Sequence, residues 1–423
     1  MTYTNSKIKL ICFVISAVTL ILFCSENIFH YPYGLMSLIG SIMLIMDIKN
    51  KKAWQYKLLF LFFFSIWLPM LIASFFSISQ ERSMLTTISY LHFLPSTYFL
   101  MKISTNIEFR RFFSYLIVAF FLFLVVDSFL QICLDYNLFG QAMIDGKVTS
   151  IFYPKQRLGI ILVLFCPIVM HVLSDLKPSR IKYIFCYVLF FSFIIVLALT
   201  LKRSAWLMFI YLLALLAIFN FHYFRTIFSY KNSLILVFFL GVSFLILQSN
   251  HNLRNSIKDS SGLVSSDATA LNVASNGRYD LWRTGLNIFQ HNFIFGVGPR
   301  GYRYVYRDFA SPSDFWITRY GAVQTHPHLF LIEILCETGI FGFLMFVFVS
   351  IKLFSLYRKY ADPWILASML ALFPLNLHLA FYGSYWSSIL WFFLGLGLGK
   401  IYSIPFMNKK IGAVQEKYGK LTE

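Results

Sequence analysis

Long apolar stretches separated by short polar ones run along most of the chain. One longer polar segment, residues 249–327, interrupts this pattern. The apolar stretches long enough for membrane-spanning helices are 8–25, 29–47, 57–78, 85–101, 112–134, 157–175, 183–201, 204–221, 233–248, 328–354, 363–380 and 384–402. The pattern predicts an all-α polytopic membrane protein with about twelve transmembrane helices and one large loop outside the membrane.

We therefore expect three parts. Residues 1–248 hold the first nine transmembrane helices, residues 249–327 form a loop with short amphipathic helices, and residues 328–423 add three helices and a tail. The composition agrees, because hydrophobic residues make up 58% of the chain, charged residues 13%, and the mean hydropathy is +0.70. These values exclude a soluble globular protein of this length.

The 36 Lys and Arg residues indicate an orientation, because cytoplasmic loops of membrane proteins retain basic residues. Most of them fall in segments that share one side of the membrane if both termini are cytoplasmic. The long polar segment then lies on the outer side. We attribute the formal charge of +18 to this topology and to the contact of basic loops with anionic membrane lipid. No nucleic-acid partner is therefore expected.

The polar segment is rich in Arg and poor in Lys. It contains the single lysine Lys258 and the arginines Arg254, Arg278, Arg283, Arg300, Arg303, Arg307 and Arg319. Arg grips phosphate through two parallel N–H groups, which favours an anionic substrate at this surface. The alternative is that these arginines only solvate a loop, and the composition supports both interpretations.

Two motifs stand out inside the polar segment. Residues 276–289 carry apolar side chains at 282, 286 and 289, the spacing of an amphipathic helix that lies along the membrane surface. A glycine-rich turn follows at 295–301. Its backbone could approach a phosphate closely, although such turns more often only change the direction of the chain.

Lys202 and Arg203 form a short basic break between two apolar helices on the outer side. Such a pair is most often an interfacial anchor whose charged ends reach the lipid headgroups. The functional alternative is that Arg203 points inward to a lipid-linked phosphate, because ionisable residues at membrane depth tend to mark substrate sites.

The polar segment ends in His326-Pro327-His328, directly before an apolar stretch. Proline is favoured at the first position of a helix, so we expect His328 in the first helical turn. The positive helix end disfavours a charged imidazole and leaves N–H groups unpaired, so His328 would be a neutral proton acceptor beside an anion site. The alternative is an ordinary interfacial histidine behind a helix start.

Taken together, these motifs resemble a known family. Five motifs, in this order, are similar to the O-antigen ligase and polymerase superfamily of bacterial envelope glycosyltransferases: Leu201–Trp206, Gly277-Arg278 with Trp282, Phe295–Gly298, His326–His328 and Glu337–Gly342. The resemblance covers residues 183–350 in detail, and the helix layout extends it to the whole chain. Two positions depart from the pattern: Leu329 stands where many relatives have Asn, and Lys202-Arg203-Ser204 stands where they have Ser-Arg-Gly.

The resemblance implies a GT-C-like fold and a metal-independent glycosyltransferase without a cofactor. Such an enzyme moves a glycan from undecaprenyl diphosphate to an acceptor at the periplasmic face of the inner membrane, with inversion at the anomeric carbon. By the family pattern, Arg203 and Arg278 bind the diphosphate and His328 acts at the acceptor hydroxyl. Arg300 is a further candidate for the diphosphate, and Lys202 and His326 are auxiliary candidates.

Three function classes remain open at this point. The first is an O-antigen ligase with lipid A–core as acceptor, and the second is a repeat-unit polymerase whose acceptor is another lipid-linked glycan. The third, a transporter or flippase, is disfavoured by the single long polar loop and by the lack of a two-half repeat.

A metal site at His326 and His328 is also disfavoured, because no further ligands stand at suitable spacing and the six Cys residues are scattered through apolar stretches. Glu333 and Glu337 point away from His328 on the expected helix. We expect these two carboxylates to pack against neighbouring helices or the loop.

Overall fold

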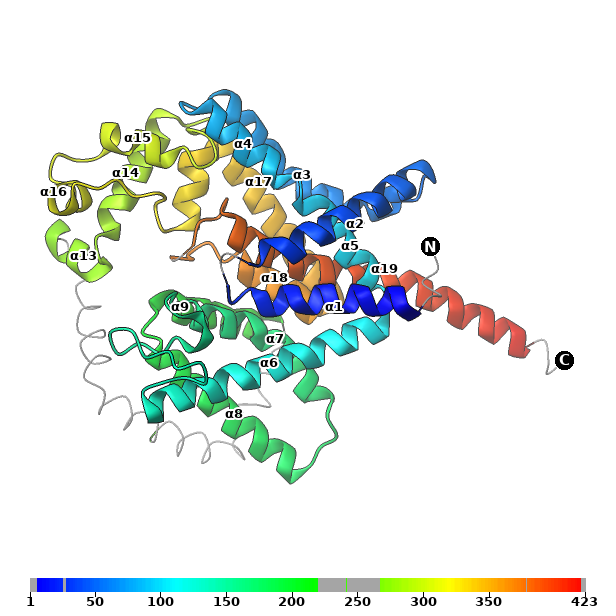
Figure 1. Cartoon of the computed structure of the whole chain (residues 1–423). Helices are drawn as coiled ribbons and strands as arrows, with labels where there is room; N and C mark the ends of the chain where they lie inside the picture. Colours follow the sequence, from blue (N-terminus) through cyan, green and yellow to red (C-terminus); the bar gives the residue numbers. More distant parts are fainter. Residues whose placement is uncertain (1–5, 26–27, 220–240, 242–266, 378, 420–423) are drawn as a thin grey trace.

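The computed structural model describes residues 6–25, 28–219, 241, 267–377 and 379–419, and it is built from α-helices (Figure 1). The first group of helices is α1 (Ser6–Leu22), α2 (His30–Lys49), α3 (Lys57–Phe75), α4 (Gln80–Tyr90), α5 (Phe93–Ser104), α6 (Ile107–Leu134), α7 (Leu158–Asp175), α8 (Arg180–Leu199) and α9 (Arg203–Phe219), with the short 3-10 helices η1 (Ala53–Tyr56) and η2 (Ser150–Phe152). The second group is α13 (Ala268–Ser275), α14 (Arg278–His291), α15 (Tyr302–Phe309), α16 (Phe315–Tyr320), α17 (Phe330–Tyr360), α18 (Pro363–Ala371) and α19 (Ser384–Gly419). No β-strand occurs within these described ranges. The predicted span 233–248, Arg254 and Lys258 lie outside them.

Several of these helices are suited to a bilayer. Among the described residues, six helices are long and apolar enough to cross a membrane: His30–Lys49, Ala53–Phe75, Ile107–Leu134, Leu158–Asp175, Arg180–Leu199 and Phe330–Tyr360. Two shorter apolar helices are Leu10–Leu22 and Arg203–Phe219. The prediction of an all-α protein with membrane-spanning helices is confirmed, while the count of about twelve spans stays a prediction.

The predicted span 85–101 is wrong, because the chain divides there into α4 and α5. The interruption lies at Leu91 and His92, just ahead of Pro95. Proline inside a helix lacks an N–H donor, and its ring collides with the carbonyl four positions earlier, here that of Leu91. The break leaves α4 as a short, separate helix.

The predicted span 363–380 is also wrong, because α18 ends at Ala371. Pro374 follows closely, and proline disfavours helical geometry at the residue before it and removes one backbone donor. The described residues that follow, 372–377 and 379–383, are not helical and lead to α19. The end of α18 is held by α19, because the Trp386 indole N–H donates to the Ala371 carbonyl at 2.7 Å.

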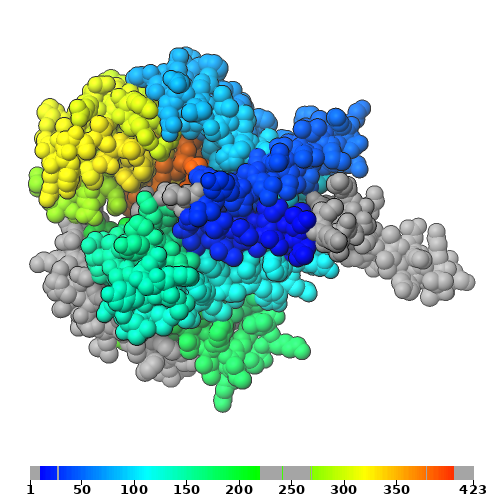
Figure 2. All heavy atoms as spheres, viewed as in Figure 1, coloured from blue at the N-terminus to red at the C-terminus, as the bar shows by residue number. Residues whose placement is uncertain are grey.

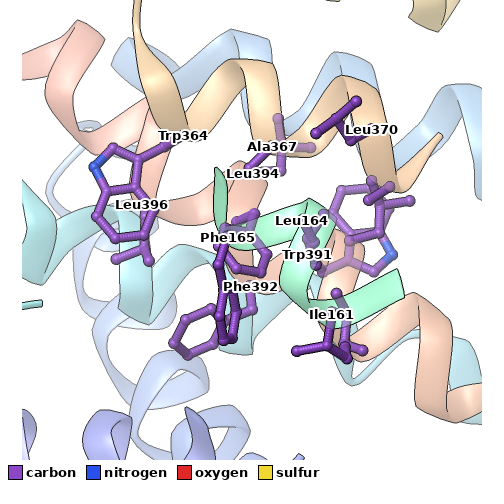
Figure 3. Packing of buried hydrophobic residues seen from close by; sticks show 14 of the residues in the cluster. Ile161, Leu164, Phe165, Trp364, Ala367, Leu370, Trp391, Phe392, Leu394 and Leu396 are labelled. Carbon is purple, nitrogen blue, oxygen red and sulfur yellow. The ribbon is translucent and has the colours of Figure 1, made fainter. Parts of the chain in front are cut away.

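The main hydrophobic core lies between the long helices. Figure 3 shows side chains of α7, α18 and α19 meeting there, among them Phe165, Trp364 and Trp391. All three side chains are buried. Because α18 is short and enclosed, its whole surface is apolar rather than one stripe.

Helices α13 to α16 form a separate lobe, which we call the short-helix lobe. It lies at one side of the molecule, whereas α1 begins and α19 ends at the opposite side (Figure 1). The lobe has its own hydrophobic cluster, which includes Leu281, Tyr302 and Tyr306 and is completed by Cys336 of α17. This contact anchors the lobe on α17.

The predicted amphipathic helix in this lobe is confirmed as α14, but its inward face differs from the one expected. The residues buried along α14 are Asp280, Leu281, Thr284, Gly285 and Ile288. Leu286, expected on the apolar face, is 43% exposed. The helix is packed on one side against α17 and the rest of the lobe, so that its outward side retains some apolar residues.

Candidate active site

The His326-Pro327-His328 loop lies just before α17, not inside it. The helix begins at Phe330 with Leu329 as the N-cap, and His328 has a positive φ of 52°. The prediction that His328 occupies the first helical turn is therefore wrong. The rings of His326 and His328 lie with their centroids 4.0 Å apart. Two positively charged imidazoles at this separation would repel each other, so the pair favours a state in which at least one ring is neutral.

The start of α17 does not offer the expected row of unpaired N–H groups. The Phe330 N–H donates to the Asn376 carbonyl at 3.3 Å, and the Leu331 N–H donates to the Pro374 carbonyl at 3.2 Å. The non-helical stretch after α18 thus caps α17 from outside. The prediction of an anion site at this helix end is wrong for these two N–H groups.

The glycine-rich turn is likewise occupied by protein. The N–H groups of Val297 and Gly298 donate to the carbonyls of Cys336 and Glu337, both at 2.9 Å. Gly298 has φ +89°, and a Cβ there would lie 2.4 Å from the Cβ of Ser77. Of the two interpretations of this turn, the structure supports a change of chain direction packed on α17 rather than a phosphate cradle.

Glu333 and Glu337 are fully buried and bind backbone, as expected. The Glu333 carboxylate accepts the N–H groups of Phe381 and Tyr382 at 2.9 and 3.3 Å. The Glu337 Oε2 atom accepts the N–H of Arg300 at 2.7 Å. These carboxylates fix the walls of the site rather than orient a histidine.

The short basic turn reaches the short-helix lobe. Arg203 is the first residue of α9, and its guanidinium donates to the carbonyl of Ala274 at the end of α13. Burial lowers the pKa of Arg278, the first residue of α14, and the nearby positive charge of Arg203 lowers it further. The structure therefore brings together the two arginines that the sequence placed 75 positions apart.

Two lysines complete this group. Burial lowers the pKa of Lys202 to about 8, and the charges of Arg278 and Lys147 act in the same direction. We call Lys147, Lys202, Arg203 and Arg278 the basic cluster. The repulsion among these four positive charges costs electrostatic free energy, and a bound anion would relieve it.

Arg278 of the basic cluster and the contact with the histidine loop lie along the same face of α14, about two turns apart. A Cβ at Gly285 would lie 2.4 Å from Ile332 and 3.6 Å from Pro327, so this face of α14 is turned toward the start of α17. Arg278 lies seven residues before Gly285. Seven residues of an α-helix rotate by about 20° less than two full turns and advance about 10 Å along the axis.

A cavity of about 640 Å³ lies beside His326. Four cationic residues line it: Arg82, Lys155, Arg157 and Arg300. Within the described part of the chain, no Asp or Glu side chain is part of its lining. The segment that leads into α19 contributes to this lining. Figure 2 shows this segment in orange, in a recess between the blue helices and the yellow short-helix lobe.

Two of these cations are held in place by their neighbours. The buried Arg157 stacks on Tyr385, with its guanidinium carbon 3.8 Å from the ring centroid. The backbone N–H of Arg300 is held by the Glu337 carboxylate. Burial lowers the pKa of nearby Arg303, and the charges of Arg300 and Arg82 lower it further. The structure thus places Arg300 and His326 at the cavity, apart from Lys202, Arg203 and Arg278.

Sequence reasoning did not single out Arg82, Lys147, Lys155 or Arg157. One signal was present: with both termini cytoplasmic, the basic residues on short outer loops are Arg82, Lys147, Lys155, Arg157, Lys202 and Arg203. Outer loops of membrane proteins are poor in basic residues. All six belong either to the basic cluster or to the cavity lining.

No group of three or more His, Cys, Asp or Glu side chains close enough to hold a metal ion occurs among the described residues. The chemistry available from the described side chains is therefore cationic binding of anions together with proton transfer by a histidine.

Comparison with known proteins supports this picture. Residues 188–347 match the family described as O-antigen ligase, which confirms the resemblance to the O-antigen ligase and polymerase superfamily. The matched part spans the basic turn, α14, the glycine-rich turn and the histidine loop. No curated protein matches the chain. The apolar helices fit a multi-pass membrane protein.

Proposed function

We propose that the protein is an O-antigen ligase, which transfers a glycan from undecaprenyl diphosphate to lipid A–core at the periplasmic face of the inner membrane. The observation that supports this proposal is the grouping of Lys202 and Arg203 with Arg278 at the start of α14, the helix that also packs against Pro327 of the histidine loop. A diphosphate leaving group and an acceptor hydroxyl need those two kinds of group side by side.

The proposed reaction is a single displacement. The acceptor hydroxyl oxygen attacks the anomeric carbon, the bond from that carbon to the phosphate oxygen breaks, and undecaprenyl diphosphate leaves. The hydroxyl proton passes to His328. Attack from the side opposite the diphosphate inverts the anomeric carbon.

Arg203 and Arg278 stabilise the leaving diphosphate by charge and by paired hydrogen bonds. This role does not need a metal ion, because the basic cluster itself neutralises the charge that develops. Lys202 adds a third positive charge. His326 supports the ring of His328, since the two rings are in contact.

A repeat-unit polymerase is the alternative, because its donor site would be the same and only the acceptor differs. The lipopolysaccharide of a deletion strain tests the choice. A ligase defect leaves lipid A–core without O-chains while undecaprenyl-linked polymer accumulates. A core that carries one repeat unit would instead indicate a polymerase.

The proposed orientation is tested by cysteine labelling in a Cys-free variant. Single cysteines at Ser313 in the short-helix lobe and at Lys51 after α2 occupy exposed positions, and we expect a membrane-impermeant reagent to label only Ser313→Cys in intact spheroplasts. Labelling of both positions from the same side would contradict the orientation.

A further inference from the structure

The cavity lined by Arg82, Lys155, Arg157 and Arg300 is a second cationic site. These four residues come from α4, from the segment before α7, from the N-cap of α7 and from the glycine-rich turn. Their convergence from parts of the chain as far apart as residues 82 and 300 is a product of the fold, not of local sequence. Among the described residues no carboxylate lines the cavity, although Glu337 lies against Arg300 and partly offsets its charge. The charges of Arg82, Lys155 and Arg157 suit the cavity to an anionic guest.

The cavity is distinct from the basic cluster. None of Lys147, Lys202, Arg203 and Arg278 is part of its lining. The charges that act on Lys202 and Arg278 are those of the cluster itself, whereas Arg82 and Arg300 act on Arg303. His326 lines the cavity and its ring contacts that of His328, so the cavity opens beside the histidine loop.

The size and walls of the cavity indicate the class of ligand. A volume of about 640 Å³ exceeds what one phosphate requires and is in the usual range for a bound small-molecule group of several rings. Arginine predominates over lysine in the lining, which favours phosphate over a single carboxylate. Tyr382, Tyr385 and Trp386 provide aromatic surface beside the cations.

We propose that this cavity binds the phosphate-bearing part of the acceptor glycolipid, so that the enzyme holds two phosphorylated lipids at once with the histidine loop between them. This inference rests on the proposed function, because it assigns the first cationic site to the donor. Phosphorylated lipid A–core and a second lipid-linked diphosphate glycan share this chemistry, and the experiment separates them.

The experiment measures binding rather than transfer, so its outcome does not depend on whether the proposed reaction occurs. Full-length detergent-solubilised protein carrying Arg203→Ala and Arg278→Ala, which silence the donor site, is titrated with each glycolipid by thermophoresis. Arg82→Gln with Lys155→Gln is then added to this background. Both side chains are exposed, so the double substitution does not disturb the core.

We expect the substitutions at Arg82 and Lys155 to weaken binding of the phosphorylated acceptor tenfold or more. The acceptor after phosphatase treatment should bind weakly and equally to both proteins. The glycolipid that responds identifies the acceptor: lipid A–core for a ligase, a lipid-linked diphosphate glycan for a polymerase. A matched control removes two other exposed arginines of the short-helix lobe, with Arg283→Gln and Arg307→Gln, and should leave the affinity unchanged.

Three results would overturn the inference. The first is unchanged affinity for both phosphorylated glycolipids. The second is equal competition by phosphatidylglycerol, which would mean that the cavity accepts any anionic lipid. The third would be seen in protein that retains Arg203 and Arg278. If the substitutions at Arg82 and Lys155 there weakened binding of the donor only, the cavity would be part of the donor site. Loss of transfer without any of these results would count against the proposed function alone.

Discussion

The basic cluster and the cavity carry charge of the same sign but hold it in different ways. In the cluster, Lys202 and Arg278 are partly buried beside other cations, and desolvation and then these charges lower the pKa values of both. In the cavity, Arg157 is stacked on Tyr385 and Arg300 is fixed through its backbone by the carboxylate of Glu337. Close, mutually repelling cations suit a compact diphosphate, whereas cations spread around about 640 Å³ suit a larger phosphorylated glycan. The two arrangements should therefore respond differently to substitution, to substrate and to pH.

The largest effect is expected at the histidine loop, which holds the proposed base and borders the cavity. His328→Ala should lower kcat by about 10²- to 10⁴-fold, the usual contribution of a general base, while the affinity for the lipid-linked donor stays within about twofold. Transfer is measured with purified enzyme, and donor binding is measured separately. Retained turnover in the variant would remove His328 from the role of base.

The next effect distinguishes the cluster from the cavity. Arg203→Ala and Arg278→Ala should each lower kcat/KM for the donor by about 10²- to 10³-fold, because they remove a group that stabilises the leaving diphosphate. The corresponding Lys variants should recover little, since lysine lacks the paired N–H groups of arginine. The KM for the acceptor should not change in the Lys variants. A variant with wild-type kcat/KM at normal expression would contradict the assignment.

A smaller effect concerns pH. Because the pKa of Lys202 is lowered to about 8, its positive charge is present at pH 7 and is largely lost at pH 9. The kcat/KM for the donor should fall by about 3- to 10-fold over this range, since this quantity reports the protonation of the free enzyme. Lys202→Arg should abolish this fall, because arginine stays protonated. An unchanged slope in Lys202→Arg would assign the pH dependence to another group.

The smallest effect is expected at His326. Its ring contacts that of His328 but is not the proposed base, so His326→Ala should lower kcat by about 10-fold or less. His326→Gln should recover part of the loss, because it restores polar contact at the same position. If His326→Ala were as severe as His328→Ala, the roles of the two rings would have to be exchanged.

Much of the fold was predictable because membrane helices are encoded locally. A run of about 20 apolar residues is enough to predict a span, and α2, α3, α6, α7 and α8 lie where the hydrophobic pattern placed them. The predicted span 328–354 corresponds to α17, which is kinked at Gly339, where the backbone is not helical. The spans at 85–101 and 363–380 failed because Pro95 and Pro374 interrupt helices without changing the average hydropathy. At α14, periodicity predicted a helix but not its inward face, which depends on α17 and the rest of the lobe.

The candidate site was predictable in its parts and not in its assembly. Sequence motifs alone pointed to Arg203, Arg278 and the histidine pair, and indicated the family that the match over residues 188–347 confirms. They also suggested free N–H groups at the start of α17 and at the glycine-rich turn. Those N–H groups are used by the carbonyls of Pro374, Asn376, Cys336 and Glu337, which no local pattern could show.

The sequence by itself determined an all-α membrane protein, the resemblance to the superfamily and the residue types of the proposed donor site. Tertiary structure alone decided which cations share a site: Arg203 with Arg278, and Arg82 with Arg300. The physical reason is that hydropathy and helix periodicity arise from neighbouring residues, whereas the grouping of charges depends on contacts across hundreds of positions. Burial and the absence of a lining carboxylate among the described residues, which give these charges their binding energy, exist only once those contacts have formed.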